Sequence, residues 1–289
     1  MVTQFLDKKK HNNKHHLCDV MGDDIEEVKT ALKEAHAKNV EGFKYVPNKR
    51  RGEFDCAWLK DALHLKTIAI GHCEIKNAHL MYELPLTMIG LDGCKLDLPL
   101  DLSQFSLLRF LGLSWREGQY VNMGEALSLT RLTLSGFDSR KASVLAVNSP
   151  TFEQLWLKHS KLIDFQKLDM PTLDRLITDY TSGLMSLDGI DNLKSLEVLR
   201  LPATEIQKFD QLGNLSNLVG LGIKAKKGIR SLDFLERLPN LTNLFISGTI
   251  LDGDLSPLLQ LKKLTDIRMP FKKTYSHTKK EILDYIARR

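Results

Sequence analysis

Apolar residues recur along this chain in a compound unit rather than in a simple helical or strand period. The unit is clearest at Leu65-x-x-Ile68-x-Ile70-x-x-Cys73-x-Ile75, where x stands for any residue. Ten copies begin 21 to 23 residues apart, at Leu65, Leu86, Leu108, Leu129, Phe152, Leu173, Leu196, Leu218, Leu241 and Leu264. A spacing this regular predicts a repeat architecture, in which each unit stacks on the next.

Each unit predicts one short strand. Alternate side chains of a strand point to opposite faces, so positions four and six, such as Ile68 and Ile70, face inward, whereas positions three, five and seven face outward. Burying an aliphatic side chain stabilises the fold by about 1.5–3 kcal/mol, but ordering each residue's backbone costs about 1–2 kcal/mol. One unit therefore cannot fold alone, and stacking must join the strands into a parallel sheet.

From about residue 40 to residue 271 the chain resembles the leucine-rich repeat family, in its short 22-residue form and as a bacterial-like stand-alone solenoid. The resemblance rests on the repeated unit and on the connecting segments 187–193 and 232–241. It implies an α/β fold: a right-handed solenoid with a curved parallel β-sheet on its concave face, short helical turns on its convex face and helical caps.

Position nine of each unit commonly holds Asn in this family. Here most copies have a small residue with weaker hydrogen-bonding capacity, namely Cys73, Cys94, Ser160, Thr181, Thr204 and Thr249. Four copies depart from that pattern, with Arg116, Phe137, Lys226 and Lys272. We expect the irregular turns at these four residues.

The pattern predicts three parts. Residues 1–62 contain a leader, a capping helix and a degenerate first repeat; residues 63–273 form a solenoid of about ten repeats; residues 274–289 form a C-terminal capping helix. The first helix is predicted over residues 25–37, with Asp23 or Asp24 as its N-cap. The degenerate repeat is Val40-x-x-Phe43-x-Tyr45.

The C-terminal helix has its own start signal. Thr278 and Glu281 form a T-x-x-E capping box. Ile282, Leu283 and Ile286 then supply an apolar stripe that would close the last repeat.

The formal net charge of +5 lies on the tails of the chain. Residues 1–16 carry a net +3 and residues 270–289 a net +4, which leaves about −2 for the remainder, so the solenoid body is not a basic surface. The chain shows no signal peptide and no membrane-spanning run, and its four cysteines form no C-x-x-C motif. We therefore expect a cytoplasmic protein in a reducing compartment, without membrane association.

Catalytic signatures are absent from the sequence. It has no G-x-G-x-x-G, phosphate loop, H-E-x-x-H or G-x-S-x-G motif, and a ladder of repeats does not converge on a pocket. We expect no enzymatic activity, no cofactor and no metal site. His11, His15, His16 and Cys18 could ligate a metal, but a flexible leader is the preferred interpretation.

The outward positions indicate a binding surface. Trp, Tyr and Arg dominate protein interfaces, and they gather on outward positions of repeats three to seven. The predicted partner-binding residues are Phe110, Trp115, Arg131, Trp156, His159, Arg175, Ile177, Asp179, Tyr180, Arg200, Phe245 and Arg268. Several apolar side chains exposed together favour a partner protein over an inert surface.

Mixed charge also favours a protein partner. Carboxylates are interleaved with Arg and Lys on these repeats, which disfavours a nucleic-acid backbone because phosphates attract cations alone. By analogy of architecture, such a binder could be an inhibitor or an immunity protein that blocks an enzyme or a toxin.

Two alternatives remain open at this point. The chain could bind nucleic acid or an anionic surface through Lys8–Lys14, Lys49–Arg51 and the C-terminal cations, with strong salt dependence. It could also be an adaptor or effector with an activity in residues 1–62. The repeat pattern does not set an oligomeric state.

Overall fold

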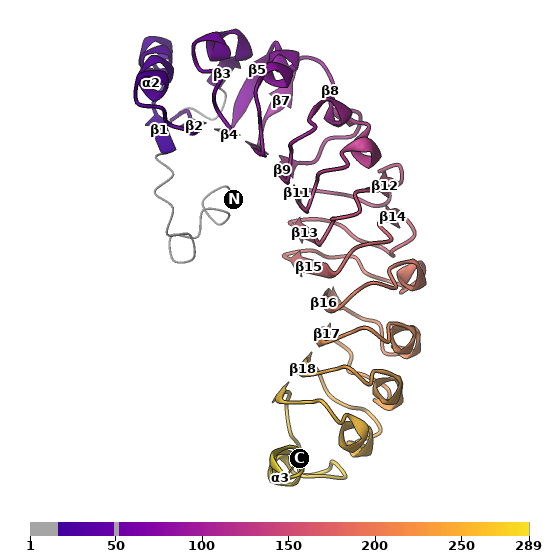
Figure 1. The fold of residues 1–289 in the computed structure, drawn as a ribbon. Helices are drawn as coiled ribbons and strands as arrows, with labels where there is room; N and C mark the ends of the chain where they lie inside the picture. The colour runs from indigo at the N-terminus through magenta and orange to yellow at the C-terminus, as the bar shows by residue number, and fades with distance from the viewer. Residues whose placement is uncertain (1–16, 49–51, 289) are drawn as a thin grey trace. The chain divides into compact units, whose positions relative to one another are not determined.

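A computed structural model describes residues 17–48 and 52–288. They fall into two compact units (Figure 1), each considered on its own. The N-terminal unit contains the described residues up to Ser135 together with residues 147–151; the C-terminal unit contains residues 136–146 and 152–288. Residues 8–14 and 49–51, and the candidate ligands His11, His15 and His16, lie outside the described part of the chain.

In the N-terminal unit, six parallel strands follow one another in chain order. They are β1 (Leu17–Met21), β2 (Gly42–Val46), β4 (Thr67–Gly71), β6 (Met88–Asp92), β9 (Phe110–Ser114) and β11 (Arg131–Ser135). Equivalent repeat positions pair, so Ile68 lies opposite Ile89 and Ile89 opposite Leu111. The 21–23-residue period therefore sets the register of the sheet.

Short strands and single 3-10 turns complete each coil of this unit. Two smaller parallel sheets consist of β3 (Gly52–Asp55), β5 (Cys73–Lys76) and β7 (Lys95–Leu96), and of β8 (Leu100–Asp101) and β10 (Tyr120–Val121). The 3-10 helices are η1 (Cys56–Asp61), η2 (Ala78–Glu83), η3 (Leu102–Gln104) and η4 (Met123–Glu125).

The C-terminal unit repeats the same plan. Its six parallel strands are β13 (Gln154–Lys158), β15 (Arg175–Asp179), β16 (Val198–Thr204), β17 (Gly220–Ala225), β18 (Asn243–Ser247) and β19 (Asp266–Arg268). A small sheet pairs β12 (Leu145–Ala146) with β14 (Leu168–Asp169). The 3-10 helices are η5 (Ile190–Asn192), η6 (Asp210–Asn214), η7 (Asp233–Arg237) and η8 (Ser256–Gln260), and they lie on the side away from the six strands (Figure 1).

Inward positions form the core, as predicted. Positions four and six are buried in every repeat except the last, where Ile267 and Met269 are half-buried. The connecting segments add large buried rings at Phe165, Phe209 and Phe234. Stacking thus removes from water the apolar groups that one repeat alone would leave exposed.

The turn residues satisfy backbone carbonyls, several of them in the preceding repeat. Cys94 Sγ donates to the Ile70 carbonyl at 3.3 Å, and Thr181 Oγ1 donates to the Leu157 carbonyl at 3.2 Å. Phe137, which departs from the small-residue pattern, is fully buried instead. Its backbone N–H donates to Ser160 Oγ, the turn residue of the next repeat, at 3.1 Å.

Both predicted helices are present. Helix α2 spans Ile25–Ala37 with Asp24 as its N-cap, and it buries Val28, Leu32 and Ala35. Helix α3 (Lys279–Ala287) begins with the predicted capping box of Thr278 and Glu281. Their role in closing the stack stays a prediction.

Two details differ from the sequence expectations. Leu283 is 41% exposed, so the buried stripe of α3 reduces to Ile282. Strand β1 was not predicted, because a single five-residue strand without the repeat spacing carries no periodic signal. It forms because Leu17–Met21 can extend the sheet by pairing with Gly42–Val46.

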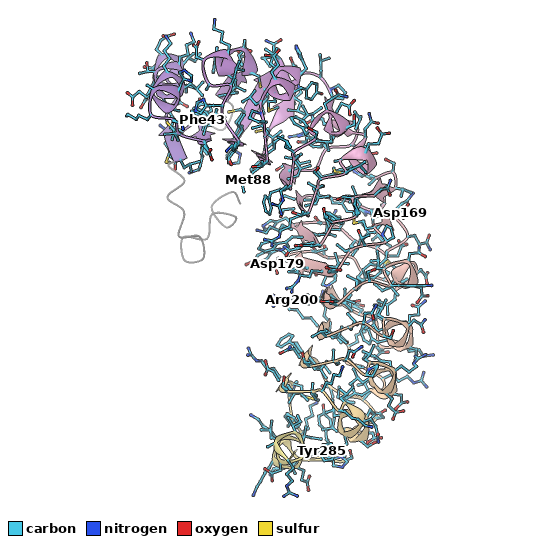
Figure 2. All side chains as sticks on the ribbon, viewed as in Figure 1. Phe43, Met88, Asp169, Asp179, Arg200 and Tyr285 are labelled. Carbon is cyan, nitrogen blue, oxygen red and sulfur yellow. The ribbon has the colours of Figure 1, made fainter. Side chains whose placement is uncertain are left out.

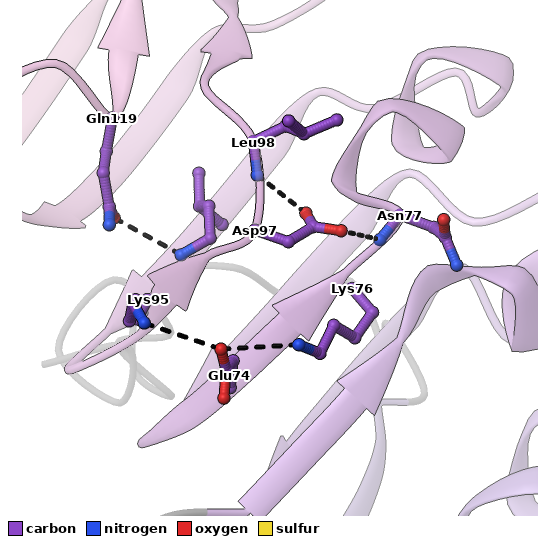
Figure 3. Close-up of polar contacts among 8 residues, drawn as sticks. Glu74, Lys76, Asn77, Lys95, Asp97, Leu98 and Gln119 are labelled. Carbon is purple, nitrogen blue, oxygen red and sulfur yellow. Dashed lines mark hydrogen bonds and ion pairs between the residues drawn. The ribbon is translucent and has the colours of Figure 1, made fainter.

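Exposed polar contacts tie neighbouring coils of the N-terminal unit together (Figure 3). Asp97 accepts from the backbone N–H groups of Leu98 at 2.9 Å and Asn77 at 2.8 Å, and Glu74 lies between Lys76 and Lys95. Surface ion pairs of this kind contribute little, about 0–1 kcal/mol. Among the described residues, no helix is long and apolar enough to cross a membrane.

Candidate partner-binding surface

Nine of the twelve predicted binding residues belong to the C-terminal unit, and Phe110, Trp115 and Arg131 belong to the N-terminal unit. The term sheet face is used for the outward side chains at positions three, five, seven and eight of the C-terminal unit's long strands. Figure 2 shows Asp179 and Arg200 on the strand side of this unit and Asp169 on the opposite side.

His159 and Tyr180 form the most exposed feature of the sheet face. Their rings are stacked, with centroids 5.0 Å apart and planes inclined by 6°. Tyr180 is 83% exposed. The pair thus presents an exposed aromatic surface on the sheet face.

The backbone beneath these rings is in the left-handed conformation. The φ angle is 46° at His159 and 51° at Tyr180. Both occupy position eight of their repeats, and the same position has positive φ at His72, Gly93, Gly136 and Gly248. Glycine adopts this conformation freely, whereas a residue with a Cβ pays about 1–2 kcal/mol. Two large aromatic residues therefore occupy a position whose backbone conformation favours glycine.

Trp156 is held in place from two sides. Its Nε1–H donates to Asp179 Oδ2 at 2.9 Å, and Lys158 Nζ lies 3.7 Å from the ring centroid. The ring is half-buried. Lys158 was expected as an outward cation of this strand, but it is only 8% exposed, and its burial against the Trp156 ring was not predicted.

The position-five residues form a row across the unit. Strand pairing places Trp156 opposite Ile177, Ile177 opposite Arg200, Gly222 opposite Phe245 and Phe245 opposite Arg268. Arg175 and Arg200 are exposed, and Phe245 is 42% exposed. Arg268 pairs with Asp266 at 3.1 Å.

The three predicted residues of the N-terminal unit make local contacts there. Arg131 Cζ lies 5.5 Å from the Phe110 ring centroid, and the two residues are paired across β9 and β11. Trp115 packs against Tyr120, with ring centroids 6.3 Å apart. Phe110 and Trp115 are half-buried.

Comparison with known proteins identifies the fold. An internalin, inlF, from Listeria monocytogenes matches with a TM-score of 0.58 at 17% identity, over 86% of this chain and 74% of the internalin. TLR13 in complex with ssRNA13 matches at 17% identity and a TM-score of 0.49, over 83% of this chain but only 44% of TLR13. The functional domain of InlJ from Listeria monocytogenes matches at 18% identity and a TM-score of 0.49, over 70% of this chain and 43% of that one.

The fold is a leucine-rich repeat. This confirms the α/β fold expected from the sequence pattern. No protein-family model matches the sequence, and no curated protein matches it.

A carboxylate row lies beside the sheet face at position two of three consecutive leucine-rich repeats. Burial raises the pKa of Asp174, and the neighbouring carboxylates of Glu197 and Glu153 raise it further, whereas Arg175 lowers it. The net direction is upward, so negative charge is crowded at this edge.

Cys73 and Cys94, the cysteines of the leucine-rich repeats, are buried. All four cysteines of the chain are free, and burial raises the pKa of the Cys73 and Cys94 thiols to about 12. At neutral pH they are thiols rather than nucleophilic thiolates. Within residues 17–48 and 52–288, no group of three or more His, Cys, Asp or Glu is placed to hold a metal ion.

Proposed function

We propose that this chain is a non-catalytic leucine-rich repeat protein that binds another protein through the sheet face of its C-terminal unit. The observation that carries the proposal is the stacked pair of His159 and Tyr180. Both rings stand at a backbone position that favours glycine, and Tyr180 is 83% exposed. Strain of this kind persists where the side chain has a use, and these rings contribute little to the core.

The surroundings of the pair support a protein ligand. Trp156 and Ile177 add apolar surface, while Asp179, Arg175 and Arg200 add charges of both signs. The acidic row at Glu153, Asp174 and Glu197 would repel a nucleic-acid backbone. Leucine-rich repeats provide the rigid scaffold that such a surface needs.

The biological role forms a finer part of the proposal. A repeat protein that covers a cleft of its partner needs no chemistry of its own, so we propose an inhibitor or an immunity protein for an enzyme or a toxin. Four free cysteines, three of them buried, fit a reducing, cytoplasmic location.

The test is affinity capture from the source cells with five versions of the immobilised protein. The wild type and the His72→Gly control should retain the same partner, because His72 shares the left-handed geometry but lies in the N-terminal unit. Tyr180→Gly should lose it by a factor of about 30, equivalent to a hot spot of about 2 kcal/mol. Trp156→Ala and Arg175→Ala should each weaken capture to a similar extent.

Two results would contradict the proposal. Equal capture by the wild type and all three sheet-face variants would remove the binding surface. Loss of the captured material on ribonuclease treatment would indicate a nucleic acid in place of a protein.

A further inference from the structure

Three exposed cations lie on the sheet face without a carboxylate to pair with. They are Arg175 on β15, Arg200 on β16 and Lys224 on β17. None of the described residues forms an ion pair with them, and the two carboxylates of the face are engaged elsewhere. Asp179 accepts from Trp156 Nε1, and Asp266 pairs with Arg268. Asp174, at the neighbouring position two, offsets part of the charge of Arg175, but the outward positions in the middle of the sheet face carry an excess of positive charge.

These cations lie on a diagonal across the sheet. Arg175 is at position three, Arg200 at position five and Lys224 at position seven, on three successive strands. Strands about 4.8 Å apart and a two-residue step of about 6.6 Å along each strand give a spacing of about 8 Å between neighbouring cations. An extended peptide presents alternate side chains about 6.8 Å apart, which nearly matches that spacing.

A shallow surface without side chains, called the glycine floor, lies beside the diagonal. It is formed by Gly220 and Gly222, the two outward residues at the centre of β17. Gly222 is paired with Arg200 on one side and with Phe245 on the other. The stem of Arg200 lies beside Gly222, where its Cγ is 3.4 Å from the place of an added Cβ. Phe245 is 42% exposed and forms the far wall. The backbone of β17 is thus accessible between a cation and an aromatic ring.

We propose that this surface binds an extended acidic segment of the partner protein, with carboxylates at alternate positions meeting Arg175, Arg200 and Lys224. An apolar side chain of the same segment lies on the glycine floor against Phe245. The inference rests on the proposed function and specifies the chemistry of its ligand. Glu153, Asp174 and Glu197 stand at position two, beside the diagonal of cations, so a segment with carboxylates only at alternate positions is favoured over RNA, which carries a phosphate at every nucleotide.

The probe is a fluorescein-labelled peptide of alternating Glu and Phe, measured by fluorescence anisotropy against the full-length protein. A peptide of alternating Lys and Phe and an oligouridylate of similar length are the comparison ligands. We expect the acidic peptide to bind, the basic peptide and the RNA not to bind, and the affinity to fall about tenfold between about 50 mM and about 300 mM salt.

Charge variants locate the binding. Arg175→Glu/Arg200→Glu should lower the affinity at least tenfold. The matched control Lys208→Glu/Lys262→Glu changes the net charge equally at exposed residues outside the strands and should leave the affinity unchanged. If the control loses as much affinity, or if the basic peptide or the RNA binds as well as the acidic peptide, the inference is overturned.

A steric variant tests the glycine floor independently of charge. A Cβ at Gly220 would meet only the Val198 methyl groups, at 3.6 and 3.7 Å, so Gly220→Leu should be accommodated without disturbing the strand. It should reduce binding of the acidic peptide about tenfold by filling the glycine floor. Unchanged binding by this variant would show that the peptide does not lie there.

The outcome is separable from that of the proposed function. If Tyr180→Gly abolishes partner capture while the acidic peptide fails to bind, the acidic ligand is wrong and the binding surface stands. If the acidic peptide binds as expected but Tyr180→Gly captures as much partner as the wild type, the acidic-peptide site stands and the proposed role of Tyr180 in partner binding is wrong.

Discussion

The rings of His159 and Tyr180 stack with their centroids 5.0 Å apart although both residues have a left-handed backbone. Two opposing effects act on this pair, and the backbone cost is the larger because it applies to both residues. The backbone conformation costs about 1–2 kcal/mol at each non-glycine residue, and an aromatic pair contributes about 0.5–1.5 kcal/mol beyond its buried area. The stack therefore does not stabilise the fold by a margin that would explain its presence.

Two substitutions of Tyr180 should separate the energy of backbone strain from the energy of ring stacking. Tyr180→Gly and Tyr180→Ala both lose the stack, but only the glycine variant relieves the backbone. We expect the glycine variant to be more stable than the alanine variant by about 1 kcal/mol in urea denaturation. At Arg200, whose φ is not positive, the order should reverse, because alanine costs less backbone entropy than glycine. An alanine variant as stable as glycine at residue 180 would mean that the left-handed turn carries no strain.

The contact between Trp156 and Asp179 should appear as a coupling energy. Trp156→Phe keeps a ring beneath Lys158 but removes the Nε1–H that donates to Asp179 at 2.9 Å. In a double-mutant cycle with Asp179→Ala, we expect a coupling of about 1.5–3 kcal/mol, the range of a hydrogen bond to a charged group. Stability changes that simply add would show that the indole and the carboxylate act independently.

Ser160 should be more important than an exposed serine of the next repeat. Its Oγ accepts from the Phe137 N–H at 3.1 Å and donates to the Lys158 carbonyl at 2.9 Å, and it is 2% exposed. Ser160→Ala leaves a buried N–H without its acceptor, so we expect a loss of about 1–3 kcal/mol in the free energy of unfolding. Ser182→Ala, at an exposed position, should change it by less than about 0.5 kcal/mol. Equal effects of the two substitutions would contradict this role of Ser160.

The pH dependence of stability should have opposite signs at Asp174 and Asp138. The pKa of Asp174 is raised by burial and by Glu197 and Glu153, so the folded state holds its proton more tightly than the unfolded state. Stability is therefore lost as the pH rises from the ordinary value of 3.8 through the raised pKa. Asp174→Asn should stabilise the protein at about pH 7, and the gain should disappear at about pH 3.

Asp138 supplies the matched comparison. A hydrogen bond from Arg140 is the main reason that the pKa of Asp138 falls to about 2. The stabilisation by the ionised Asp138 carboxylate is present above pH 3.8 and is lost as the pH falls toward 2. Asp138→Asn should therefore destabilise the protein at about pH 7. Thermal melts across this range check both signs, and a shift of the same sign in the two variants would contradict the assignment.

The sequence predicted most of the fold because one period governs it. Once the ten starts are known, the register of the strands and the inward pairs such as Ile68 and Ile70 follow from alternation alone. Helix α2 was also predictable, because its apolar spacing and its acidic N-cap agree. Strand β1 was not, since its pairing with β2 depends on a neighbour and not on its own pattern.

The candidate surface was predictable in its residues but not in its geometry. Outward positions could be named from alternation, yet nothing local shows that Lys158 is buried against Trp156. The left-handed conformation of His159 and Tyr180 has a signal in the sequence. Glycine occupies the same position in other repeats, at Gly93, Gly136 and Gly248, and aligning the repeats by position eight would have revealed it.

Position eight also has a consequence for how new specificities could arise. At Gly136, one repeat before His159, φ is 78° and an added Cβ would meet nothing within 4 Å. The bend there already has the shape that carries a ring in the following two repeats. Exchanging glycine for an aromatic residue at such a bend would lengthen or shorten the recognition platform while the path of the main chain stayed the same.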